Sequence, residues 1–173
     1  MYWQEVSGNW FLVPDRPKAI IHFLGGAFVA AAPHLTYRWI LEALYAEGYA
    51  VIATPFVNTF DHSAIALETL TTFNQGLTFL TKKRPELVSL PIYGLGHSMG
   101  CKVHLLIGSS DNTPLSQRAG NIFISFNNFP ARKSIPLLDQ LMQLAPDLQL
   151  DTRIEYTPSP EQTLSMISDH YQT

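Results

Sequence analysis

A serine between two glycines is the group in this sequence whose residue types and spacing most clearly suggest chemistry. Residues 96–100, Gly-His-Ser-Met-Gly, have the spacing G-x-S-x-G, with an apolar stretch before them and an amphipathic stretch after them. A serine on a sharp turn between a strand and a helix presents its hydroxyl above a sheet edge. Glycines two residues before and after it leave room where the two backbones crowd together. Ser98 is therefore a candidate nucleophile, and the free N–H groups at the start of the following helix could stabilise an oxyanion.

Length and composition indicate the number of domains and limit the kinds of partner that the protein could bind. The chain has 173 residues, of which 46% are apolar and 14% charged, with a net charge of -3. These values predict one domain, 1–173, with buried central elements, and they give no electrostatic reason for binding nucleic acid or an anionic membrane. The apolar runs are strand-length, so no membrane span is predicted.

The N-terminus and the cysteine content indicate a location. The chain starts Met-Tyr-Trp-Gln-Glu, without the basic and apolar regions of a signal peptide. Cys101 is the single cysteine, which excludes an intrachain disulfide and is compatible with a reducing compartment. We expect a cytoplasmic protein that is not secreted.

The elements that must position Ser98 follow from hydrophobic periodicity. Short apolar runs bounded by turn residues predict strands, and apolar residues at helical spacing predict helices. The pattern begins with an edge hairpin within 3–13. The predicted strands are then 18–24, 49–55, 90–95, 121–126 and a short one at 153–156, and the predicted helices are 35–47, 60–84, 99–107, 138–145 and 160–171. Ser159 and Gln162 have the spacing of a capping box for the last helix.

The alternation of buried strands and helices predicts the fold class. It is typical of α/β proteins with a mostly parallel, doubly wound sheet between two helical layers, a three-layer sandwich. Ligands of such sheets bind beyond the carboxyl ends of the strands. Here those ends are Gly25-Gly26, Pro55 onward, Ser98 and Asn127-Asn128. The candidate site is expected at that edge.

These motifs resemble the α/β-hydrolase fold with its nucleophile elbow. The first central strand leads into Gly25-Gly26, similar to the family's oxyanion loop in either of two frames, one of which gives His22 the place of the family's His-Gly histidine. The resemblance implies backbone N–H donors from Gly26, or its neighbour Gly25, together with Met99, and we prefer the pair Gly26 and Met99.

Several further stretches are similar to an uncharacterised hydrolase-like domain family of photosynthetic organisms, in whose members a plastid location is also conceivable. They are Gly-Gly-Ala-Phe-Val, Ala-Thr-Pro-Phe, Thr-Phe-Asp-His, Gly-His-Ser-Met-Gly and Phe-Asn-Asn-Phe-Pro-Ala. That family implies a fold but no substrate.

The catalytic acid and base are not evident. The hydrolase order is Ser, then Asp or Glu, then His, but only His104 and His170 follow Ser98, one within the elbow helix and one near the C-terminus. The chain therefore looks like the N-terminal two-thirds of a longer domain. An incomplete sheet would expose an edge through which copies could pair into a homo-oligomer.

Histidines upstream of Ser98, or at its side, are further candidates for the base. His62 follows Asp61, its candidate acid partner, at the ligand edge, although helix capping by Asp61 is the simpler interpretation. His34 follows the oxyanion loop, where a loop-surface role is simpler. His97 beside the nucleophile is better explained by packing. No metal site is predicted, since His and Cys do not recur at ligand spacing, and no cofactor is predicted, since no phosphate-binding fingerprint is present.

The sequence leads to two hypotheses. The first is a serine hydrolase that acts by acyl transfer on a small ester or thioester. Phe residues at the same edge of the sheet suggest that this substrate is hydrophobic. The alternative is a non-catalytic module of the same fold that binds a ligand or partner at this edge.

Overall fold

The computed structural model describes residues 2–110, 118–130 and 155–171, so the predicted helix 138–145 lies outside the described residues.

The chain begins with the hairpin that its sequence predicts. Strands β1 (Gln4–Val6) and β2 (Asn9–Leu12) pair antiparallel. Ser7 and Gly8 join them with φ angles of 50° and 74°, which permit the tight reversal.

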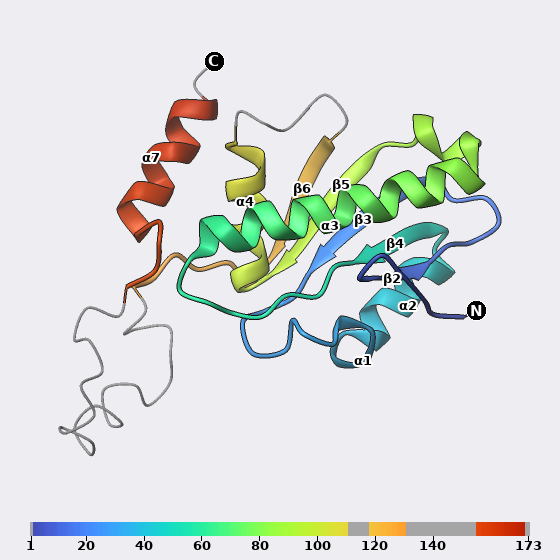
Figure 1. Cartoon of the computed structure of the whole chain (residues 1–173), viewed down its shortest axis with the longest axis horizontal. Coiled ribbons are helices and arrows are strands. Elements are labelled where there is room, and N and C mark those ends of the chain that lie inside the picture. Colours follow the sequence, from blue (N-terminus) through green and yellow to red (C-terminus); the bar gives the residue numbers. More distant parts are fainter. Residues whose placement is uncertain (1, 111–117, 131–154, 172–173) are drawn as a thin grey trace.

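A six-stranded sheet forms the centre of the molecule, in the order β1-β2-β4-β3-β5-β6 (Figure 1). The four strands β4 (Tyr49–Ala53), β3 (Ala19–Leu24), β5 (Ile92–His97) and β6 (Arg118–Ile124) are parallel, and β2 joins β4 antiparallel. Every residue of β3 is buried, as expected for the middle of a sheet with helices on both faces. The α/β fold class is confirmed.

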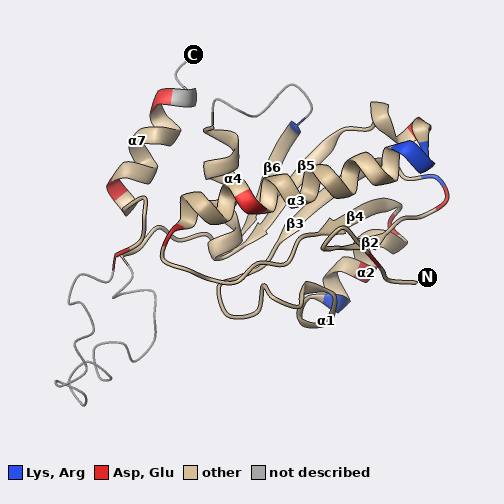
Figure 2. Ribbon diagram, in the orientation of Figure 1, with Lys and Arg blue, Asp and Glu red and all other residues tan. Residues whose placement is uncertain are grey.

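The charge distribution agrees with this burial. The four parallel strands carry one charged residue, Arg118 at the start of β6, and most charges lie toward the ends of helices and in loops (Figure 2). Among the described strands, β6 lies at one edge of the sheet and β1 at the other. Pairing of copies through this edge stays a prediction.

Helices cover both faces of the sheet. Helix α2 (Arg38–Ala46) lies on one face, and α3 (His62–Lys83) and α4 (Met99–Gly108) lie on the other. A 3-10 turn η1 (Pro85–Ser89) follows α3, and α7 (Pro160–Tyr171) contacts α4. The predicted helix 35–47 is instead two helices, because Tyr37 leaves helical geometry between α1 (Pro33–Thr36) and α2.

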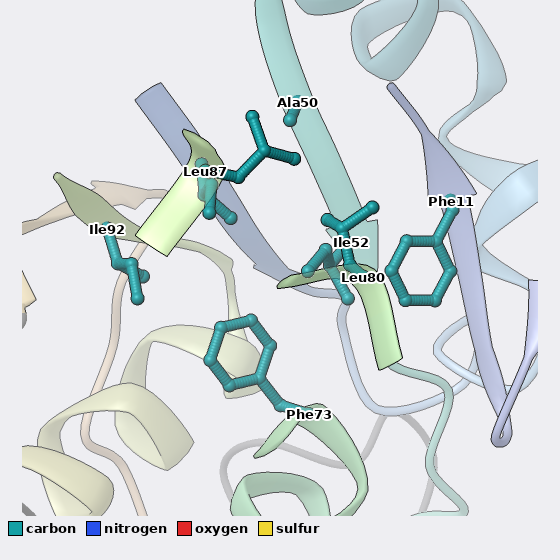
Figure 3. Packing of buried hydrophobic residues seen from close by; sticks show 8 residues of the cluster. Phe11, Ala50, Ile52, Phe73, Leu80, Leu87 and Ile92 are labelled. Atoms are coloured by element: carbon teal, nitrogen blue, oxygen red, sulfur yellow. The ribbon is translucent and has the colours of Figure 1, made fainter. Parts of the chain in front are cut away.

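Packing on the sheet anchors the middle and the C-terminal end of α3. Phe73 and Leu80 of α3 pack against Ile52 and neighbouring strand residues (Figure 3). Burying one such side chain stabilises the fold by roughly 1.5–3 kcal/mol. The opposite face is held by a second cluster that includes Phe23 and Leu41.

A chain of hydrogen bonds crosses the interior on the α3 face. Arg118 Nη2 lies 2.7 Å from His22 Nδ1, His22 Nε2 lies 3.1 Å from Thr54 Oγ1, and Thr54 Oγ1 donates to Asn9 Oδ1 at 2.6 Å. Because a guanidinium can only donate, His22 accepts at Nδ1 and donates from Nε2. Arg118 Nη1 also donates to Nδ1 of His104, at 3.1 Å. His22 is therefore a core residue in this chain of bonds, and the frame that places it in an oxyanion loop is wrong.

Candidate active site

Ser98 lies on the turn that joins β5 to α4, as the sequence predicts. Its backbone angles are φ 52° and ψ -116°, a conformation that L-residues rarely adopt and that costs roughly 1–3 kcal/mol. Neighbours hold this turn: the Ser98 N–H donates to the Ile124 carbonyl of β6 at 2.9 Å, and the Cys101 N–H donates to the Ser98 carbonyl at 3.1 Å. The strain is thus maintained by the sheet and the helix on either side of Ser98.

The two glycines of the motif are required by close backbone contacts. A Cβ on Gly96 would lie 2.6 Å from the Cys101 nitrogen. A Cβ on Gly100 would overlap the Leu24 carbonyl oxygen and lie 2.7 Å from that of Gly25. Helix α4 therefore packs directly on the end of β3, which brings Ser98 beside the loop that follows β3.

A cavity of about 250 Å³ opens at Ser98 on this edge of the sheet. Its walls come from the loop after β3, the elbow, the segment after β6, and three side chains from other elements: residues 26–29, 97–99 and 127–129, with His62, Lys102 and Tyr156. Most of this wall is apolar, and the polar side chains of His62, Ser98 and Lys102 are part of it. Asn128, in the segment after β6, uses its amide Nδ2 to donate to the Pro160 carbonyl at 2.8 Å.

The loop after β3 differs from its expected role in one respect. The Gly26 N–H donates to the Tyr37 hydroxyl at 2.8 Å, and that hydroxyl lies 2.8 Å from His97 Nδ1. Burial raises the pKa of Tyr37, so the phenol is protonated. The Gly26 N–H is thus occupied, contrary to the expectation that it serves an oxyanion. Gly25 does not line the cavity.

Two other backbone N–H groups remain available at the cavity. Met99 is the first residue of α4, where an N–H has no acceptor within the helix. Ala27 lines the cavity, and no hydrogen bond among the described residues uses its N–H. Met99 and Ala27 therefore replace Gly26 as the candidate backbone donors at this cavity.

His62 also lines the cavity, at the start of α3. Asp61 caps this helix by accepting from the Ala64 N–H at 2.9 Å, which is the simpler role considered for it, and its exposed side chain does not line the cavity. The His62 ring is buried 4.2 Å from the Tyr156 ring, and neither ring nitrogen has a partner among the described residues. Burial, then the charge of Lys102, lowers the pKa of His62 to about 4. The imidazole is neutral at pH 7.

Lys102 is a site residue that the sequence did not indicate. It lies one turn into α4, is 4% exposed, and lines the same cavity. Its Nζ donates to the Pro158 carbonyl at 2.8 Å and lies 5.4 Å from the centre of the Tyr156 ring. Burial lowers the pKa of Lys102 to about 8. A lysine in an amphipathic helix usually lies on the solvated face, so only the tertiary structure places it here.

The remaining candidates lie elsewhere or have other partners. His34 stacks on Trp10 with ring centres 3.5 Å apart, and it does not line the cavity, so the structure does not bring it to Ser98. Cys101 is buried, its Sγ lies 3.4 Å from the Ile124 carbonyl, and burial raises its pKa to about 11. The side chain of His170 lies outside the described residues.

Two other kinds of feature are absent from the described residues. Within ranges 2–110, 118–130 and 155–171, no three His, Cys, Asp or Glu side chains gather as they would around a metal ion. No described helix is both long and apolar enough to cross a membrane.

The sheet order, the elbow and the flanking helices define an α/β-hydrolase-like fold, and solved structures agree. A lipase in its open form superposes with a TM-score of 0.51 and 17% identity, over 93% of this chain and 51% of the lipase. A thermostable carboxyl esterase from Bacillus coagulans superposes with a TM-score of 0.52 and 18% identity, over 95% of this chain and 60% of the esterase. An esterase from Pyrococcus furiosus superposes with a TM-score of 0.53 and 18% identity, over 94% of this chain and 55% of that esterase. The chain thus spans between half and three fifths of these proteins.

The sequence also identifies a family. Its model matches residues 2–173, so the chain belongs to the family described as "Protein of unknown function (DUF1350)". The comparison with curated proteins gives no match.

Proposed function

We propose that this protein is a serine hydrolase that transfers the acyl group of a small ester or thioester to water. The observation that carries the proposal is the position of Ser98, on a strained turn in the wall of a cavity at the carboxyl ends of the strands. The similar solved structures are a lipase and two esterases, and their activities support the same reaction class.

The residues suggest roles in a two-step reaction. Ser98 Oγ attacks the substrate carbonyl and gives its proton to a base. The bond from the carbonyl carbon to the leaving oxygen or sulfur then breaks, the leaving group takes the proton, and an acyl-serine remains. Water attacks the acyl-serine to release the acid and restore Ser98. The Met99 and Ala27 N–H groups would stabilise each oxyanion, and one such donor typically contributes about 10²–10³ in rate.

His62 is our proposed base. It is neutral at pH 7, it lines the cavity, and its ring nitrogens have no partner among the described residues. By contrast, Nδ1 of His97 is held by Tyr37. Protonating His62 beside Lys102 costs about 3 kcal/mol more than protonating a free imidazole, by about 1.4 kcal/mol per pKa unit. The negative charge that develops on the oxyanion would offset part of that cost.

Hydrolysis of 4-nitrophenyl butyrate tests the proposal. The wild-type chain should release nitrophenolate, and Ser98→Ala should lower kcat/KM by at least about 10³, because a hydrolase without its nucleophile keeps only the contribution of binding and the oxyanion donors. Ser109→Ala is the matched control. Ser109 lies at the far end of α4 and bonds the Leu105 carbonyl, so its loss should leave the rate unchanged. Equal rates for wild type and Ser98→Ala would refute the proposal.

A further inference from the structure

Lys102 places a buried positive charge in a cavity wall whose described residues carry no negative one. The described lining residues include neither Asp nor Glu. Neither of the two ion pairs among the described residues involves Lys102, since these are Arg38 with Glu42 and Arg84 with Glu86. Removing an ammonium from water is costly unless an opposite charge compensates it. The Pro158 carbonyl and the Tyr156 ring supply only part of that compensation.

We propose that Lys102 binds a carboxylate carried by the substrate, so that the natural substrate is an ester or thioester with a second, anionic end. This inference rests on the proposed hydrolase function, because it names the substrate class for the same cavity. A carboxylate would give the buried ammonium its missing counter-charge at the moment of binding.

The placement of the two residues on α4 supports one substrate reaching both. Ser98 precedes the helix and Lys102 follows one turn later, and helical side chains lean toward the helix N-terminus. This tendency is compatible with an ammonium on the Ser98 side of the helix, and both residues line one cavity of about 250 Å³. Such a cavity suits an acyl chain of a few carbons.

Other residues of the cavity wall fit a substrate with an ester at Ser98 and a carboxylate at Lys102. His62, neutral and without a ring partner among the described residues, can donate an N–H to the same carboxylate. Phe28, Met99 and Phe129 supply apolar wall for the carbons between the two ends. The Asp61 carboxylate would not compete, since it is exposed and bonded to the Ala64 N–H.

Binding to the Ser98→Ala variant tests the inference without requiring turnover. Isothermal titration calorimetry at pH 7 compares monomethyl adipate, which carries one carboxylate, with dimethyl adipate, its neutral counterpart. The monoester should bind Ser98→Ala at least about tenfold more tightly, as expected for a hydrogen bond to a charged group. Adding Lys102→Gln, which keeps a donor for the Pro158 carbonyl but removes the charge, should reduce the preference to about twofold or less.

Two further variants separate charge from structure. Lys102→Arg keeps the charge and should keep most of the preference, while Lys82→Gln removes an exposed charge at the far end of α3 and should change nothing. Equal affinity for the two esters, no measurable binding of the monoester, or a preference that survives Lys102→Gln would overturn the inference. The two proposals can fail separately. If the wild-type chain leaves esters intact while Ser98→Ala still prefers the monoester, only the hydrolase proposal is refuted.

Discussion

Replacing Gly100 by alanine should disrupt the elbow, and the structure sets the size of the effect. The added Cβ would overlap the Leu24 carbonyl oxygen and lie 2.7 Å from the Gly25 oxygen. Both obstacles are backbone atoms at the end of β3, so neither can rotate away, and α4 must move outward. Overpacking of this kind typically costs 1–3 kcal/mol, and we expect about 3 kcal/mol because the obstacles are rigid. In a domain of this size that lowers Tm by about 6–12 °C.

Thermal unfolding followed by circular dichroism measures this shift. The control is Gly120→Ala in β6, where the added Cβ would meet its nearest neighbour, Tyr93 Cδ1, at an ordinary 3.9 Å. That variant should unfold within a few degrees of wild type. If Gly100→Ala were as stable as Gly120→Ala, the direct packing of α4 on the end of β3 would be refuted.

Three other predictions concern titrating groups. His22, His62 and His104 have pKa values lowered by burial and nearby cations, so unfolding takes up protons below the unfolded value of about 6.5. Stability should therefore fall between pH 7 and 5 by up to about 1.4 kcal/mol per pH unit for each histidine, and a constant Tm over that range would contradict this. If His62 is the base, the rate at which a fluorophosphonate labels Ser98 should be flat from pH 6 to 8, whereas a tenfold rise per unit would assign the base to Lys102. Cys101, buried with its pKa raised to about 11, should resist iodoacetamide at pH 8 until the chain is denatured, and rapid alkylation of native protein would argue against its burial.

The elements around Ser98 could be predicted because their signals are local. The strand, turn and helix at residues 90–107 are encoded by one continuous stretch, and the cap at Asp61 depends on a backbone N–H three residues away. The capping box at Ser159 is equally local, with mutual bonds to Gln162. The break at Tyr37 escaped prediction because the apolar spacing continues through it.

The parts of the site that escaped prediction depend on distant contacts. The Gly26 N–H is occupied by the Tyr37 hydroxyl, and that hydroxyl also contacts His97, 60 residues later in the sequence. Lys102 is buried because the segment around Pro158 folds over it, 56 residues later. His22 bonds Thr54 and Arg118, which are 32 and 96 residues away, so the sequence alone left open the frame that gives this strand histidine a place in the loop.

The most direct test of the account is whether Ser98 is an activated nucleophile. Wild-type chain and Ser98→Ala are incubated with a fluorophosphonate at pH 7.5 and weighed by intact-protein mass spectrometry. The account predicts one adduct on wild type, mapped to Ser98 by peptide analysis, and none on Ser98→Ala. Wild-type chain that stays unlabelled while folded would contradict the account and favour a ligand-binding module of the same fold.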